Sequence, residues 1–302
     1  MKTTINFTPK TTHPPQSPTL LITGATGAIG SELTKLLSER GVPFRALVRN
    51  PHEATRLAAL PGADIWQGDF NDPTTLANAL TGVDRAFLLT NSSEYAQAQQ
   101  LRFVSEARQA GVTHIVKLSQ LAASEQSPVR FLRYHAVVEQ AIQQSGMNFT
   151  FLRPNLFMQG FLGFRELIKQ GTLFAPIGDA PVSLIDIRDI AAVAVAALTQ
   201  PGHEGNTYTL TGPQALTHAE IAATFATVLG HPVTFTDVSP DTMRNAVIQA
   251  GFPVWQADGL IEDYAHYSRY EASTVTSVVN DVTAQPSRSF ADFVRAYAPA
   301  FA

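Results

Sequence analysis

Three glycines near the N-terminus have the spacing of a phosphate-binding loop. Gly24, Gly27 and Gly30 follow an apolar run at residues 20–23 and precede a helical pattern at residues 31–40. Between a strand and a helix, such glycines allow a tight turn, a close approach of backbone N–H groups to a pyrophosphate, and close packing of the helix on the sheet. The positive end of the helix also favours an anion. A dinucleotide is therefore expected at this loop, and a tight turn without a ligand is the alternative.

Arg49 predicts which dinucleotide binds. It follows the second predicted strand, residues 44–48, at the position where an NAD site carries Asp or Glu for the ribose 2′-OH. A guanidinium instead forms paired, charge-assisted hydrogen bonds with a 2′-phosphate. NADPH is therefore favoured over NADH, with Asn50 assisting. A solvated surface arginine is the alternative interpretation.

The ends of the third and fourth predicted strands supply further contacts. Asp69, beside Phe70, is placed to reach the adenine edge, although an aspartate that caps a loop fits equally well. Thr90 and Asn91 end the fourth strand and are expected beside the ribose or the nicotinamide. The cofactor contacts expected in this part of the chain are Gly24, Thr26, Gly27, Ala28, Ile29, Gly30, Arg49, Asn50, Asp69, Phe70, Thr90 and Asn91.

Composition narrows the classes of function. The 302 residues are 45% hydrophobic and 15% charged, enough to bury a large core. A net charge of −4 without a Lys/Arg run gives no electrostatic footprint for nucleic acid or an anionic membrane. The chain has no cysteine, and its eight histidines lack metal-ligand spacing, so no metal site is expected. Residues 1–18 predict a flexible tail, and the absence of a long apolar run predicts a cytoplasmic protein.

The elements that position these residues form an α/β pattern. Between residues 19 and 154, helical patterns separate short apolar or β-branched runs at residues 20–23, 44–48, 64–67, 85–90, 114–119 and 149–153. Strands with helical crossovers predict a Rossmann-type, doubly wound parallel sheet that binds NADP. The mixed pattern of residues 155–302 predicts a smaller C-terminal α/β substrate lobe over the carboxyl ends of the strands. Segments within residues 182–212 are expected to return to the first domain.

Together, these motifs resemble the NmrA-like, atypical branch of the short-chain dehydrogenase/reductase family. The resemblance spans residues 19 to about 297 and rests on segments 24–30, 48–49, 68–69, 152–158, 186–189 and 209–212. It implies NADPH as the cofactor and is greatest to the quinone, azo-dye and triphenylmethane-dye reductases of this branch. The family also contains NADPH sensors without catalysis and a transcriptional regulator.

The resemblance places a degenerate catalytic set in this chain. Ordinary members of the superfamily reduce carbonyls with Ser, Tyr and Lys, the last two as Tyr-x-x-x-Lys on one helix face. Here Ser119 stands in the serine position, Phe131 in the tyrosine position and His135 in the lysine position. Phe131 cannot donate the proton that a developing alkoxide needs. Quinones and cationic dyes need that acid less, so flat, conjugated acceptors are expected.

His135 has two interpretations. It hydrogen-bonds the nicotinamide ribose or the acceptor, or it pairs with Glu139 at i, i+4 on the helix surface. Tyr134 is not expected to replace the missing acid, because one residue along a helix turns a side chain by about 100°.

The sixth predicted strand leads to the expected acceptor end of the site. The resemblance implies contacts of Pro154, Asn155 and Phe157 with the nicotinamide. An apolar slot for an aromatic substrate is also expected, although aromatic residues at helical spacing often belong to the core. The residues expected to line this slot are Phe157, Met158, Phe161, Trp255 and Tyr264.

The leading hypothesis is an NADPH-dependent oxidoreductase that passes hydride directly to a small conjugated aromatic acceptor, such as a quinone or azo compound, without flavin or metal. The rival hypothesis is a non-catalytic protein that senses NADP(H). In both, the chain is expected to be a monomer or homodimer that binds neither nucleic acid nor membrane.

Overall fold

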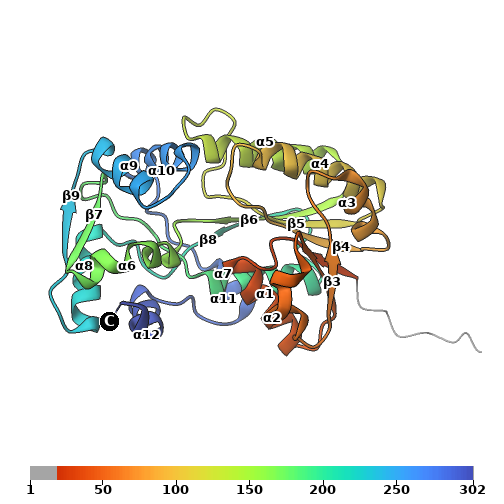
Figure 1. The fold of residues 1–302 in the computed structure, drawn as a ribbon, viewed down its shortest axis with the longest axis horizontal. Coiled ribbons are helices and arrows are strands. Elements are labelled where there is room, and N and C mark those ends of the chain that lie inside the picture. The colour runs from red at the N-terminus through yellow and green to blue at the C-terminus, as the bar shows by residue number, and fades with distance from the viewer. Residues whose placement is uncertain (1–18, 302) are drawn as a thin grey trace, which may run out of the picture.

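The computed structural model describes residues 19–301 of the chain. The predicted tail, residues 1–18, lies outside the described residues. A seven-stranded parallel sheet runs through the molecule in the order β3-β2-β1-β4-β5-β6-β8 (Figure 1). The strands are β1 Leu20–Ile22, β2 Phe44–Val48, β3 Ala63–Gln67, β4 Arg85–Leu88, β5 His114–Leu118, β6 Asn148–Pro154 and β8 Asn206–Leu210. This is the doubly wound Rossmann-type order, and it confirms the predicted fold class.

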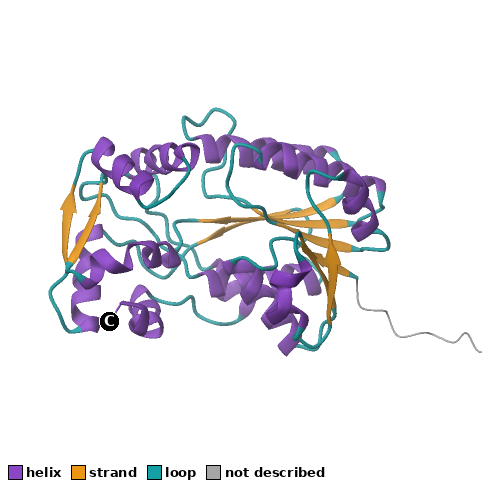
Figure 2. Ribbon diagram, in the orientation of Figure 1, coloured by secondary structure: helices purple, strands orange, loops and turns teal. Residues whose placement is uncertain are grey.

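Helices cover both faces of the sheet (Figures 1 and 2). One face carries α1 Ala28–Glu39, the 3-10 helix η1 Pro51–Ala54, α2 Thr55–Ala58, α7 Ile187–Thr199 and α11 Val278–Thr283. The other face carries α3 Pro73–Leu80, α4 Ala96–Gln109 and α5 Arg130–Gln144. Because both faces are covered, the central strands are buried; β1 and β5, for example, have no exposed residue.

The C-terminal half of the chain returns to this sheet. β8 extends the sheet beside β6, and α7 packs against α1. Ile185 and Ile187 belong to the same hydrophobic cluster as the first strand. A long crossover through α7 therefore returns the chain to the sheet, and elements before and after this return form a second cluster.

That second cluster has its own small parallel sheet, β7 with β9, and its own apolar core. Its elements are the 3-10 helix η2 Met158–Phe164, α6 Arg165–Lys169, β7 Thr172–Ala175, α8 His218–Leu229, β9 Thr234–Asp237, α9 Pro240–Gln249, α10 Val254–Tyr267 and α12 Phe290–Phe301. η2 leads directly into α6, and β7 lies within a stretch, residues 171–181, that is rich in Gly and Pro.

Helix α10 joins the second cluster to α5. The Arg130 guanidinium pairs with Glu262 at 2.7 Å and lies 5.5 Å from the Trp255 ring centroid. At Gly259 a Cβ atom would lie 2.3 Å from the Phe131 ring, so only glycine permits this close approach. The contact fixes the position of Phe131 at the carboxyl ends of the strands. Within residues 19–301, no helix combines the length and apolar character needed to cross a membrane.

Candidate active site

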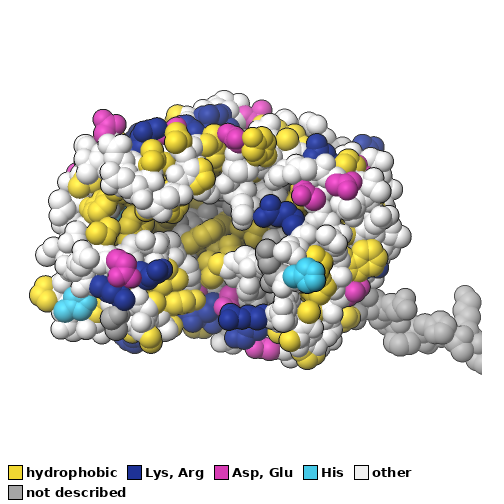
Figure 3. All heavy atoms as spheres, in the orientation of Figure 1, with side chains coloured by type: hydrophobic (Ala, Val, Ile, Leu, Met, Phe, Trp, Pro, Cys, Tyr) yellow, Lys and Arg dark blue, Asp and Glu magenta, His cyan; other side chains and the backbone are white. Residues whose placement is uncertain are grey.

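A cavity of about 1080 Å³ lies at the carboxyl ends of the strands, between the large sheet and the second cluster. Figure 3 shows this side of the molecule hollowed at its middle, with hydrophobic side chains in the floor. The cavity contains most of the residues that the sequence predicted for the cofactor: Gly24, Thr26, Gly27, Ala28, Ile29, Arg49, Asp69, Phe70, Thr90, Asn91, His135, Pro154, Asn155 and Phe157. Ser119 lines it too. The fold therefore brings residues from six strand ends to one place.

The glycine loop has the geometry of a phosphate cradle. Gly24 has a φ of +62°, and a Cβ on Gly30 would lie 2.1 Å from the carbonyl oxygen of Gly24. Gly27 caps α1 without a side-chain hydrogen bond, so the amides at the helix start have no side-chain acceptor. Thr26, Gly27 and Ala28 are exposed to the cavity. These features fit a pyrophosphate, because its oxygens would accept hydrogen bonds from the free amides. Gly30 serves the packing and does not itself line the cavity.

Arg49 is exposed at the cavity rim and has no ion pair with any residue that the structure describes. Its guanidinium is thus available for an anion. Asn50, predicted to assist it, lies off the cavity and caps η1, accepting a hydrogen bond from the His52 amide at 3.1 Å. Asp69 lines the cavity and also accepts from the Asn71 amide at 2.7 Å, so both of its predicted roles fit its position.

Ser119 belongs to a buried polar network. Its hydroxyl donates to the carboxylate of Glu139 on α5, and the Arg153 guanidinium donates to the same carboxylate, with Nε at 3.0 Å from Oε1. Ser119 and Glu139 are both nearly inaccessible to solvent. The serine proton is therefore directed at Glu139. One of the two interpretations of His135 paired it with Glu139 on the helix surface, and the structure does not support that one, because Glu139 is buried and bound to Ser119 and Arg153.

His135 instead contacts Lys117, a lysine within the buried strand β5. The Lys117 Nζ atom lies 2.7 Å from His135 Nδ1 and 3.0 Å from the Leu118 carbonyl oxygen. Burial lowers the pKa of Lys117 to about 7, and burial followed by the nearby Lys117 and Arg153 charges holds the pKa of His135 well below its usual range. When Lys117 is charged it can only donate, and His135 Nδ1 then accepts, which places the hydrogen of the neutral ring on Nε2.

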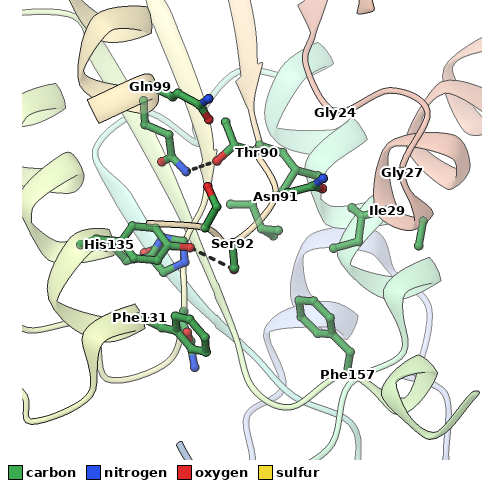
Figure 4. Close-up of a pocket in the computed structure, with 18 of the residues that line it drawn as sticks. Gly24, Gly27, Ile29, Thr90, Asn91, Ser92, Gln99, Phe131, His135 and Phe157 are labelled. Atoms are coloured by element: carbon green, nitrogen blue, oxygen red, sulfur yellow. Dashed lines mark hydrogen bonds between the residues drawn. The ribbon is translucent and has the colours of Figure 1, made fainter. Parts of the chain in front are cut away.

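Aromatic rings form the walls at the acceptor end. Figure 4 shows Phe131 and His135 on one side of the cavity and Ile29 and Phe157 on the other. Tyr134 also lines the cavity, with its hydroxyl 3.3 Å from Ser92 Oγ and its ring 4.2 Å from that of His135. The sequence did not predict that the Tyr134 side chain lines the cavity. Burial raises the pKa of Tyr134 to about 12, so its hydroxyl stays protonated near neutral pH.

Comparison with known proteins decides the family. The profile of the NmrA-like family matches residues 16–286. The chain belongs to the NmrA-like family. It is 40% identical to the NAD(P)H azoreductase of Xenophilus azovorans, over 93% of this chain and 99% of that protein.

Two solved structures share its fold, and each has a sequence similar to that of this chain. The Citrobacter sp. triphenylmethane reductase complexed with NADP(H) has a TM-score of 0.83 and 29% identity, covering 92% of this chain and 99% of that one. The NADPH-dependent quinone oxidoreductase from Escherichia coli complexed with NADPH has a TM-score of 0.84 and 28% identity, covering 91% and 98%. These matches confirm the predicted family and the predicted class of enzyme, an NAD(P)H-dependent reductase, with NADP(H) as its dinucleotide.

Four residues predicted for the acceptor slot lie elsewhere in this NmrA-like chain. Met158, Phe161 and Tyr264 are buried in the second hydrophobic cluster. Trp255 packs against Phe131, with 5.3 Å between ring centroids, and does not line the cavity. The aromatic spacing that suggested a slot belongs to core packing. Of the predicted slot residues, Phe157 does line the cavity.

Several cavity residues were not predicted for the site. Ser92, Gln99, Gln100 and Gln120 come from strand ends and the loops or helices that follow them, and Asp263 and Tyr267 come from α10. Lys117 had a signal in the sequence, because a charged residue inside a buried parallel strand is unusual. Asp263 had none, since α10 is distant in the chain. Among residues 19–301 no cluster of His, Asp or Glu side chains has a grouping that would hold a metal ion.

Proposed function

We propose that this NmrA-like protein is an NADPH-dependent reductase that passes hydride directly to a conjugated aromatic acceptor, without flavin or metal. The observation that carries the proposal is that one cavity has both a phosphate cradle at one end and aromatic walls at the other. Its volume of about 1080 Å³ is at the upper end of ordinary ligand sites, which suits a dinucleotide with a second molecule beside it. Residues 19–154 with their returning segments would form the cofactor domain, and the rest the acceptor lobe.

Arg49 supports NADPH over NADH in this proposal. Its guanidinium is exposed at the rim, at the end of β2, without an ion pair among the described residues. A 2′-phosphate there would receive charge-assisted hydrogen bonds, whereas NADH offers only a hydroxyl. The cradle at Gly24 and Gly27 would hold the pyrophosphate of either dinucleotide.

The chain's own residues would bind and orient the reactants. When bound, the reduced nicotinamide supplies the hydride. His135 lines the cavity with its Nδ1 held by Lys117, so Nε2 would be the ring atom that hydrogen-bonds the nicotinamide ribose or the acceptor. Ser119 would act mainly through the Glu139 network that fixes the end of β5. Neither supplies a strong acid, so Ser119 and His135 by themselves suit acceptors whose reduced form is a weak base.

The aromatic walls support a flat acceptor. Phe131, Tyr134 and Phe157 offer ring faces and edges that stack on conjugated systems. The names of the relatives agree, since they are an azoreductase, a triphenylmethane reductase and a quinone oxidoreductase. We therefore place the acceptor between these rings, beside the nicotinamide.

Steady-state oxidation of NADPH with a panel of quinones, azo dyes and triarylmethane dyes tests the proposal. We expect turnover with at least one of these classes and negligible reduction of simple aliphatic ketones. The full-length protein, purified and verified to contain no flavin, is the material to use. Tight NADPH binding without turnover across the panel would contradict the proposal and favour the sensor.

A further inference from the structure

A polar corner with no assigned role lies at the acceptor end of the cavity. Asp263 on α10 lines the cavity together with Gln120 and Tyr267. The side chain is buried, with 6% relative exposure, and Gln120 Nε2 donates to its two oxygens at 3.0 and 3.2 Å. One donor satisfies only part of the capacity of a carboxyl group. The corner therefore presents the Asp263 carboxyl to a molecule in the cavity. Gln120, which hydrogen-bonds this carboxyl, directly follows Ser119 at the end of β5.

The neighbouring groups are poor proton donors. Phe131 has no acidic proton, and the Ser119 hydroxyl is directed at Glu139. His135 is neutral in its contact with Lys117. Burial holds the pKa of the Tyr134 hydroxyl at about 12 and that of Tyr267 well above its usual range. None of these side chains has both a free proton and a pKa that suits a general acid at neutral pH.

The carboxyl of Asp263 does have a pKa that suits this role. Burial raises the pKa of Asp263 to about 7, opposed by the Gln120 hydrogen bond and reinforced by the Glu262 charge. A general acid works best when its pKa lies near the operating pH. The titratable groups coupled to it are Tyr134 from α5 and Glu262, Tyr264 and Tyr267 from α10. Glu262 is itself paired with Arg130, at 2.7 Å.

We propose that Asp263 is the proton donor to the acceptor, and that Gln120 positions it. The inference rests on the proposed function, because it assumes hydride transfer in the same cavity. With an azo acceptor, the hydride bonds to one nitrogen, and the π electrons of the N=N bond move to the other nitrogen. That nitrogen takes the proton from the Asp263 carboxyl. NADPH is oxidised to NADP⁺, the azo compound becomes a hydrazo compound, and the Asp263 carboxylate regains a proton from water.

Acceptors differ in their need for this proton. An azo compound gains a negative charge on the second nitrogen unless a proton arrives. A cationic triarylmethane dye becomes neutral when hydride adds to its central carbon, and it needs no proton. The ratio of the two rates therefore separates the role of Asp263 from effects on folding or cofactor binding, which the two reactions share.

The test compares Asp263→Asn with the native protein on one azo dye and one cationic triarylmethane dye. We expect the azo-to-cationic ratio of kcat to fall about 100-fold or more, the effect of losing a general acid. The kcat/KM profile for the azo dye should lose its break near pH 7. Asp258→Asn is the matched control, since Asp258 lies on the same helix and pairs with Arg244 at 2.7 Å, outside the cavity wall. It should leave the ratio unchanged.

An infrared titration gives a readout independent of turnover. The carbonyl band of a protonated carboxyl should titrate near pH 7 in the native protein and be missing from Asp263→Asn. Equal losses with both dyes, or a carboxyl midpoint below about pH 5, would each overturn the proposal. If the native protein turns over no acceptor of the panel, quinones included, the proposed function itself fails and the donor role falls with it.

Discussion

The two ends of the cavity are built in different ways. The cofactor end is made of backbone at the start of α1 and of single residues directly after successive strands. The acceptor end is made of side chains from α5, α10 and the segment after β6, held by contacts between distant parts of the chain. The first end depends on local geometry, and the second depends on tertiary packing. Substitutions at the two ends should therefore have different consequences.

The largest expected effect is at the glycine loop. A Cβ on Gly30 would meet backbone atoms, the Gly24 oxygen at 2.1 Å and the Ala25 Cα at 2.7 Å, which cannot move cheaply. We expect Gly30→Ala to lower the free energy of unfolding by about 3 kcal/mol and to abolish measurable NADPH binding. Urea unfolding and titration of NADPH fluorescence measure the two effects. Gly163→Ala, where a Cβ meets no atom within 4 Å, is the control and should change stability by less than about 0.5 kcal/mol.

The acceptor side should be sensitive to acid. His218 at the start of α8 is fully buried, neither ring nitrogen has a partner among the described residues, and burial lowers its pKa to about 4. The folded state resists protonation, so its stability is full above pH 6.5 and falls as the pH decreases towards 4. The shift corresponds to about 3 kcal/mol. His218→Leu should reduce the slope of the unfolding free energy against pH over this range, leaving the share of other buried histidines such as His114, whereas His231→Leu, a partly exposed control, should leave the slope unchanged.

At the cofactor rim, Arg49→Ala tests the dinucleotide preference. Charge-assisted hydrogen bonds to a 2′-phosphate are worth about 1.5 to 3 kcal/mol. We expect NADPH binding to weaken about 10- to 150-fold, with little change for NADH, measured as dissociation constants for both. Equal binding of both dinucleotides by the native protein would show that Arg49 does not select between them.

The smallest effects are expected at Ser119 and His135. If hydride transfer to an activated acceptor is the difficult step, Ser119→Ala and His135→Ala should each cost less than the roughly 100-fold typical of a general acid. Part of the loss should appear as a higher KM for NADPH, because both side chains belong to the packed end of β5 and α5. Ser105→Ala, an exposed serine on α4, controls for the truncation. Reduction of an unactivated ketone that disappears in His135→Ala would instead make His135 the acid.

The same contrast explains what could be predicted from the sequence. The glycine loop, Arg49 and the strand ends follow from spacing along the chain, because each element is short and local. The environment of Ser119 could not be predicted. It depends on the rotation of α5, which places Glu139 beside Ser119, and on the contact of Arg153 with the same carboxylate. Gln120 and Asp263 lie 143 residues apart and meet only through the docking of α10. Trp255 and Tyr264 were misplaced because helical spacing alone does not say which face meets a cavity.

Deuterium transfer tests the central claim of direct hydride transfer most directly. NADPH carrying deuterium in the transferable position at nicotinamide C4 is mixed with the flavin-free protein and a cationic triarylmethane dye. The central carbon of the reduced dye does not exchange its hydrogen with water, so it records the origin of the atom. Direct transfer predicts deuterium at that carbon and slower turnover than with unlabelled NADPH. Deuterium lost to water, or turnover only after flavin is added, would contradict the account.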